Sequence, residues 1–154
     1  MNVFLVDEQD EPLDGAALRR FAELVLEQEG FPPTTELAVH LVAVDHMAEY
    51  NGRFMDRQGP TDVLAFPLED LSPGVVPRLA PDDPPIVLGD VFLCPAEIRR
   101  RSATERVPFD DYLFFDLAHG ILHLLGYGHE DDRSADAMAR REDELLDAIG
   151  KAMS

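Results

Sequence analysis

A long apolar segment near the C-terminal end of the chain sets the strongest limit on its fold. Apolar residues fill the stretch from Leu113 to Leu125 with few breaks, which predicts a helix buried on nearly every side. Pro108 stands before it, and proline is favoured at the start of a helix. Gly126 follows it, and glycine readily takes the left-handed conformation that ends a helix and reverses the chain. We therefore predict a buried helix from Pro108 to Gly126.

Three of the chain's five histidines, His119, His123 and His129, lie within eleven residues at the end of this helix. Residues four apart share one helix face, with β-carbons about 5–6 Å apart, so the first two can bind one metal ion. A reversal at Gly126 would bring the third back towards them. A structural zinc site normally adds a fourth ligand, commonly cysteine, and the chain has only Cys94. The pattern predicts one catalytic zinc ion per chain, with an open position for water.

Two other interpretations compete with the metal site. A single histidine on an apolar helix is usually a packed residue, but two unpartnered imidazoles in a buried helix would carry a desolvation cost that a metal relieves. The spacing His-x3-His-x2-Gly-x2-His also occurs in metzincin proteases. Those enzymes need glutamate directly after the first histidine as general base, and here Gly120 stands there. A metallopeptidase-like hydrolase is therefore an alternative that this residue disfavours.

The rest of the sequence predicts short strands and amphipathic helices around this core. Residues 68–85 are rich in proline and acidic residues without an apolar period, which predicts a long loop. The order βαβαββααα indicates an α+β fold, a small mixed sheet packed with helices, with the metal site on a buried helix and the turn after it. We expect residues 1–154 to form a single metal-dependent hydrolase domain. Strands are predicted at 3–6, 36–44, 61–66 and 86–93, the last broken at Gly89-Asp90, and helices at 14–30, 45–54, 95–101, 108–126 and 134–149.

The charge of the chain argues against broad contact with nucleic acid. Its 31 acidic and 13 basic residues give a formal net charge of −18, and such a field repels nucleic acid and anionic membranes. Arg99, Arg100 and Arg101 form the densest basic group. They fit either a solvated helix face balanced by acids or a contact with RNA.

The sequence also bears on where the protein works. No apolar run approaches the roughly 18–20 residues that span a bilayer. The N-terminus lacks the basic region of a signal peptide, and a single cysteine cannot form an internal disulfide. We expect a cytoplasmic protein without a membrane or disulfide-linked partner.

Three segments resemble the YbeY family of single-strand-specific metallo-endoribonucleases. They are His119–His129, Pro60–Pro67 and Leu88–Asp90, and the resemblance extends over about residues 36–149. It implies that the three histidines bind zinc. It also implies cleavage of single-stranded RNA in small-subunit ribosomal RNA 3′ end maturation and ribosome quality control, with ribosomal RNA and the small subunit as partners. A zinc-stabilised ribosome assembly factor with little catalysis is the alternative.

The sequence departs from that family at three positions. Phe54-Met55 stand where the family commonly has Tyr-Arg, Ala65 stands where it has serine, and Gly128 where it has aspartate. The family's arginine is held to be functionally important. Arg53 and Arg57 are therefore our candidates for the group that stabilises charge on the phosphate.

The base that takes the proton from the attacking water is not specified by the sequence. Asp62, Asp90 and Glu130 are candidates, although Asp62 and Asp90 also suit the ordinary role of capping turns at strand ends. His40 lies inside an apolar run and is expected to be a packed strand residue. Cys94 is expected to be a small buried hydrophobic residue.

Overall fold

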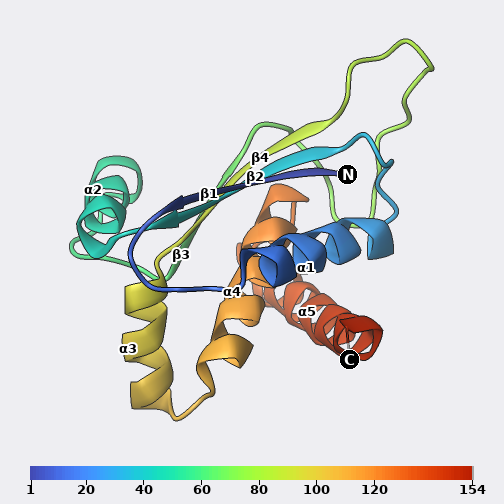
Figure 1. The fold of residues 1–154 in the computed structure, drawn as a ribbon. Coiled ribbons are helices and arrows are strands. Elements are labelled where there is room, and N and C mark those ends of the chain that lie inside the picture. The colour runs from blue at the N-terminus through green and yellow to red at the C-terminus, as the bar shows by residue number, and fades with distance from the viewer. Residues whose placement is uncertain (154) are drawn as a thin grey trace.

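The computed structural model describes residues 1–153 and has the element order that the sequence predicts (Figure 1). The predicted α+β fold is confirmed. The elements are β1 (Asn2–Glu8), α1 (Gly15–Gln28), β2 (Glu36–Val42), α2 (Val44–Met55), β3 (Val63–Pro67), β4 (Val87–Leu93), α3 (Pro95–Glu105), α4 (Phe109–Leu124) and α5 (Asp132–Met153).

The four described strands form one mixed sheet in the order β1-β2-β4-β3. The pairs β1–β2 and β2–β4 are parallel, and β3 is antiparallel to β4 at the edge. Pro67, which lies just beyond the predicted strand 61–66, is the last residue of β3 and pairs with Gly89. An edge strand tolerates this because the missing N–H of proline costs no ladder bond there.

The predicted break in β4 is a bulge inside a continuous strand. Two residue steps on β2, from Glu36 to Ala38, face three on β4, from Val87 to Asp90. Gly89 has a φ of +131°, and a β-carbon there would lie 2.2 Å from the carbonyl oxygen of Phe66. Only glycine fits a backbone that passes so close to the neighbouring strand.

Helix α4 lies at the centre of the fold, as its apolar sequence predicts. It contacts β3 and β4 on one side and α1, α3 and α5 on others, and Figure 1 shows it between the sheet and the C-terminal helix. Leu117, Ile121 and Leu124 are fully buried. A smaller cluster, which includes Met47 of α2 and Cys94, packs apart from this core, and Cys94 is buried as expected.

Several helix boundaries differ from the predicted ones by a few residues. Helix α2 begins at Val44 after an N-cap, Ala43, whose side chain makes no capping bond. Helix α5 begins at Asp132, and the Asp131 carboxylate accepts a hydrogen bond from the Ser134 N–H in its first turn. The segment 68–85 has no helix or strand, as predicted, whereas Ile86, predicted to begin a strand, lies just before β4. Among residues 1–153, no helix combines the length and the apolar character that crossing a membrane requires.

Candidate metal centre

Helix α4 carries His119 and His123 on one face, one turn apart. Their ring centroids are 4.7 Å apart, and their Nε2 atoms are 3.1 Å apart. Both side chains are half-buried. The remaining faces of α4 pack into the core, so the two imidazoles have a fixed support.

The turn after α4 adds His129 to this pair. Gly126 has a φ of +101°, and its N–H donates to the carbonyl of His123 while the N–H of Tyr127 donates to the carbonyl of Leu122. These two bonds are the Schellman ending of a helix. The reversed chain places the Nε2 atom of His129 at 3.3 Å from that of His119.

Gly126 also lies against the beginning of the long loop. A β-carbon at this position would lie 2.2 Å from the carbonyl oxygen of Leu71. Leu71 itself packs against the main core. Glycine therefore serves two purposes here, since it allows the positive φ and lets the loop form one wall of the histidine site.

The tautomers of the first two histidines follow from their partners. The Nδ1 atom of His123 lies 3.1 Å from the carbonyl oxygen of Tyr127, which can only accept, so this nitrogen carries the proton. The Nδ1 atom of His119 forms a hydrogen bond with the carboxylate of Glu142. In the neutral rings both Nε2 atoms then present lone pairs to each other at 3.1 Å.

Lone pairs at this distance repel unless a cation lies between them. Ligand atoms of all three histidines lie within 4.8 Å of one another. A tetrahedral zinc ion with Zn–N bonds of about 2.0–2.1 Å would separate its ligand nitrogens by about 3.3–3.4 Å. The measured separations of 3.1 and 3.3 Å are close to that value. The donor set therefore fits a metal ion.

The electrostatics of the site favour the form of histidine that binds metals. Burial lowers the pKa of His123, and the neighbouring His119 and His129 lower it further. A lowered pKa keeps the imidazole neutral, and the neutral ring is the one that donates a lone pair to a metal.

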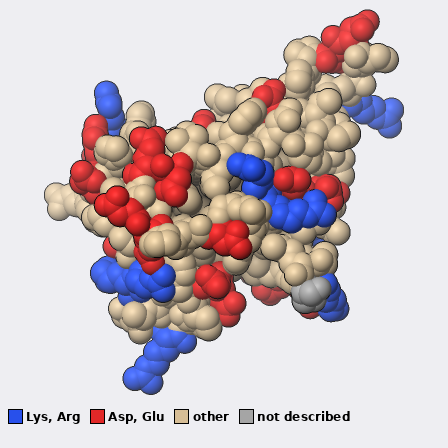
Figure 2. Space-filling model, viewed as in Figure 1, with Lys and Arg blue, Asp and Glu red and all other residues tan. Residues whose placement is uncertain are grey.

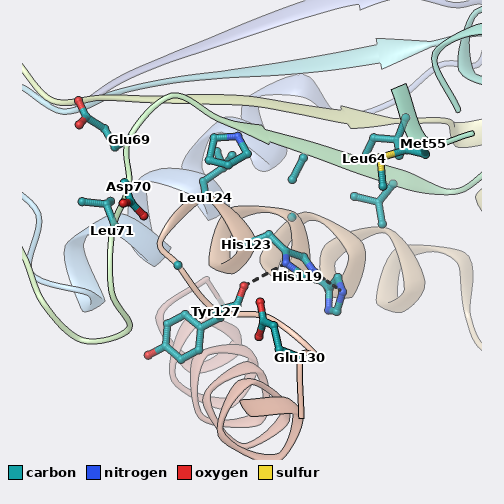
Figure 3. A pocket seen from close by; sticks show the side chains of 15 residues that line it. Met55, Leu64, Glu69, Asp70, Leu71, His119, His123, Leu124, Tyr127 and Glu130 are labelled. Atoms are coloured by element: carbon teal, nitrogen blue, oxygen red, sulfur yellow. Dashed lines mark hydrogen bonds between the residues drawn. The ribbon is translucent and has the colours of Figure 1, made fainter. Parts of the chain in front are cut away.

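Two hollows flank the histidines. One, of about 440 Å³, lies between α4, β3 and the start of the long loop, and His119, His123 and Glu130 line it (Figure 3). The other, of about 530 Å³, lies on the far side of His119, towards the first half of α4. His119 and Val63 line both. The candidate metal position thus lies on a surface depression that an extended ligand could cross.

Acidic side chains dominate the polar lining of these hollows. Glu69, Asp70 and Glu130 line the first, and among the described residues no arginine or lysine lines either. The carboxylates that line the second are Asp62, Glu105, Asp111 and Asp116. A phosphate group bound in either hollow would therefore contact no cationic side chain that lines it. A metal ion would be the main positive charge near that phosphate.

The packing of α4 explains why residue 120 is not glutamate. A β-carbon on Gly120 would lie 2.7 Å from a methyl group of Val91 and 3.2 Å from one of Val63. The helix therefore approaches the sheet too closely for a larger side chain. This is a physical reason for the absence of the general base that the metzincin mechanism requires at this position.

The three candidate general bases lie in different places. Glu130 lines the first hollow and Asp62 the second. Asp90 lies 2.8 Å from Nε2 of His40 and lines neither hollow. His40 is half-buried and stacks on Phe92, so it is the packed strand residue that the sequence predicts. Of the three, only Glu130 and Asp62 line a hollow that His119 also lines.

The three consecutive arginines of α3 are engaged in contacts within the chain. Arg99 pairs with Glu11 and lies 3.7 Å from the centre of the Phe109 ring. Arg100 pairs with Glu97. Arg101 bridges the same glutamate and Asp62, whose side chain is 14% exposed. Figure 2 shows basic side chains over α3 as one of several separate groups, with acidic side chains between them.

The two arginines near the end of α2 stand outside both hollows. Arg53 lies 3.8 Å from Glu49 and 5.7 Å from the centre of the Phe54 ring. Arg57 is exposed and forms no ion pair with another described residue. Met55, by contrast, lines the hollow next to His119 and His123 (Figure 3). The structure brings the three histidines together but does not bring these arginines to them.

Two buried acidic residues of this region were not predicted from the sequence. Glu142 of α5 is 4% exposed, and Asp116 of α4 is 3% exposed. Both interrupt apolar helix faces, since Glu142 falls on the same buried stripe as Met138 and Leu145. A charged residue at a core position of a helix was the signal that could have found them.

Asp116 is the more unusual of the two acids. Its Oδ2 atom accepts no hydrogen bond from a donor among the described residues. Burial raises the pKa of its carboxyl to about 9, and a hydrogen bond with Asp62 and the charge of that residue contribute further. At neutral pH the Asp116 carboxyl is therefore protonated and can donate to Asp62.

Comparison with known proteins agrees with the resemblance found in the sequence. The family model described as endoribonuclease YbeY matches residues 6–150. Proteins named endoribonuclease YbeY from Acidothermus cellulolyticus and Nocardioides sp. are 39% and 36% identical over 149 and 148 residues. Each match covers 96% of this chain, and 91% and 97% of the two relatives. A solution structure of a Thermotoga maritima protein with 23% sequence identity has the same fold, with a TM-score of 0.59. The structural match covers 97% of this chain and 93% of the Thermotoga chain.

Proposed function

We propose, since this chain belongs to the endoribonuclease YbeY family, that it is a zinc-dependent enzyme that cleaves single-stranded RNA. Family membership supports the endoribonuclease role. The observation that carries the metal dependence is the convergence of three imidazoles within 4.8 Å beside an open hollow. Residues 1–154 act in this proposal as a single metal-dependent hydrolase domain.

In this proposal the residues of the centre have two roles in hydrolysis, metal binding and proton transfer. His119, His123 and His129 would hold one zinc ion per chain, which supplies Lewis acidity and lowers the pKa of water to about 7. Glu130 lines the same hollow and is exposed, so its carboxylate can accept the proton of an attacking water. Asp62 is the weaker candidate because Arg101 and Thr61 already donate to it.

Because no cationic side chain among the described residues lines the first hollow, a side chain that stabilises charge on the phosphate would come from outside it. We keep Arg57 and Arg53 as the candidates that contact the phosphate, and we place Arg57 first. Its side chain is exposed and forms no ion pair with a described residue, whereas Arg53 contacts Glu49 and Phe54. Both flank Met55, which reaches the hollow itself.

Changing Met55 to arginine is expected to raise the rate of RNA cleavage. The new guanidinium would stand in a hollow otherwise lined by carboxylates and could donate to a phosphate in the transition state. We expect kcat/KM for a single-stranded oligoribonucleotide to increase about tenfold or more. Met55→Leu, which keeps the apolar side chain, is the control. An M55R rate equal to that of M55L would show that the position does not contact the substrate.

We place the reaction in the cytoplasm, in small-subunit ribosomal RNA 3′ end maturation and ribosome quality control. The family supports RNA as the substrate. The formal charge of −18 disfavours capture of free RNA by the protein alone. This supports a substrate that is presented by another particle, for which we propose the small ribosomal subunit.

Arg99, Arg100 and Arg101 remain the proposed RNA contact, and their ion pairs decide how to test it. Arg101 bridges two partly buried acids, so its replacement would disturb the fold. Arg100 is 65% exposed at its side chain. Arg100→Gln removes the charge but keeps an N–H donor for the buried Glu97. It is expected to weaken RNA binding in a filter assay without changing the zinc content, and unchanged binding would remove Arg100 from the RNA contact.

A second function, a zinc-stabilised ribosome assembly factor with little catalysis, is favoured by one observation. No arginine or lysine lines either hollow among the described residues. The deciding experiment compares cleavage of single-stranded RNA with cleavage of casein, using wild-type protein and a His119→Ala variant purified in parallel. We expect RNA cleavage by the wild type alone. Cleavage that persists in the variant would indicate a contaminating nuclease, and folded, zinc-loaded protein without cleavage would favour the assembly factor.

A further inference from the structure

A buried carboxylate of the C-terminal helix contacts the first histidine of the metal centre. Glu142 is 4% exposed and lies on the face of α5 that packs into the core, close to Met138 and Leu145 in the buried stripe. Its Oε1 atom forms a hydrogen bond with Nδ1 of His119. A carboxylate buried to this extent requires a strong polar partner, and the imidazole is the partner that the structure gives it.

We propose that Glu142 is the positioning residue that prepares His119 to bind the metal, an inference that rests on the proposed function. The carboxylate accepts a hydrogen bond from Nδ1–H, so it fixes the tautomer in which the Nε2 lone pair is free. It also prevents rotation of the ring about its Cβ–Cγ bond. Negative charge on this side of the ring increases the basicity of the nitrogen on the other side.

The three histidines are unequal in this respect. His119 has a carboxylate behind it, and His123 has the neutral carbonyl of Tyr127. His129 is exposed, and its described polar contact is with Nε2 of His119. His119 is also the ring whose Nε2 lies within 3.3 Å of both others, so it occupies the middle of the set. A group that orients His119 therefore fixes the ring that lies close to both of the others.

A purely structural role would be to fasten α5 to α4, and the chain contains a matched control for it. Arg141, the neighbouring residue on α5, forms an ion pair with Glu29, whose side chain is 6% exposed, as is that of Glu142. That pair fastens α5 to the end of α1 and involves none of the histidines. Removing it tests the cost of a lost buried contact of α5 without touching the centre.

The experiment measures zinc affinity and the ligand field of the site. Full-length wild type, Glu142→Ala, Glu142→Gln and Glu29→Gln are titrated with Zn²⁺ against a chromophoric chelator. The same proteins loaded with Co²⁺ give the visible absorption bands of the metal. Circular dichroism and urea unfolding of the metal-free proteins report the fold.

We expect E142A to bind zinc about 10–100-fold more weakly and to shift the cobalt bands. E142Q keeps an oxygen that accepts from Nδ1–H but lacks the charge, so it should recover part of the affinity. E29Q should lower stability while zinc affinity stays at the wild-type value. If E142A does not fold, the comparison of E142Q with E29Q decides in its place.

Two results would overturn the inference. The first is an E142A variant that binds zinc with wild-type affinity while its stability is lowered as in E29Q. If E142A does not fold, the same result in E142Q counts. The other is an equal loss of affinity in E29Q, which would mean that any loosening of α5 has this effect. Failure of the proposed function has a different signature, because zinc-loaded wild type that does not cleave RNA leaves the affinity comparison intact.

Discussion

Replacing His123 by alanine is expected to reduce the zinc content from about one ion per chain to near zero and to lower RNA cleavage by about 1,000-fold or more. His123 is half-buried, and its Nε2 atom lies 3.1 Å from that of His119. Two imidazoles alone leave half of a tetrahedral shell to water, and the ion then dissociates readily. Elemental analysis of the purified variant and its kcat/KM on a single-stranded oligoribonucleotide check this prediction.

The same substitution should remove the stabilisation that zinc gives to the fold. A ligand present at about 1,000 times its Kd stabilises the native state by about 4 kcal/mol. Urea unfolding of the wild type should therefore shift to lower concentration when zinc is chelated, and unfolding of H123A should not respond to zinc. His46→Ala is the control, since it removes a histidine of α2 outside the metal group. Wild-type zinc content in H123A would contradict the assignment of this ligand.

Changing Asp116 to asparagine is expected to stabilise the protein at neutral and alkaline pH. Burial is the main cause that raises the pKa of Asp116 to about 9 in the folded state, whereas an exposed aspartate has a pKa of about 3.8. The folded protein thus holds a proton that the unfolded chain releases. Its contribution to stability is complete below about pH 4 and is lost as the pH rises towards 9, by at most about 1.4 kcal/mol per pH unit.

Asparagine has no proton to lose, and its amide can replace the carboxyl O–H as donor to Asp62. The difference in free energy of unfolding between D116N and wild type should therefore grow from near zero at pH 4 to about 2–4 kcal/mol at pH 8. Urea titrations at several pH values measure it. Asp111→Asn, an exposed residue of the same helix, is the control and should give no such trend. A difference that does not change with pH would mean that Asp116 is ionised in the folded state.

The histidine centre could be predicted because its geometry is local. All three candidate ligands fall within eleven residues, two of them one helical turn apart and the third after a turn that glycine at position 126 closes. Helical periodicity and the conformational freedom of glycine are properties of the chain itself. The order of strands and helices was predictable for the same reason, since each element has its own apolar period.

Element ends and strand neighbours were less predictable. Pro67 remains in β3 because it lies on an edge, and Gly89 lies in a bulge because another strand passes close to it. The sheet order β1-β2-β4-β3 places β4 between elements distant in sequence. These outcomes depend on which strands pair, and pairing is a contact between segments far apart along the chain.

The sequence by itself determined the element order, the buried helix and the identity of the metal-binding candidates. The tertiary structure alone decided which charged groups surround them. In the folded chain Arg101 forms an ion pair with Asp62, and Glu142 forms a hydrogen bond with His119. Met55 lines the same hollow as His119 and His123. Local backbone preferences act over a few residues and can be read from the order of amino acids. The partner of a buried charge is set by packing across the whole domain, because desolvation favours pairing each ionised group with a neighbour from another element.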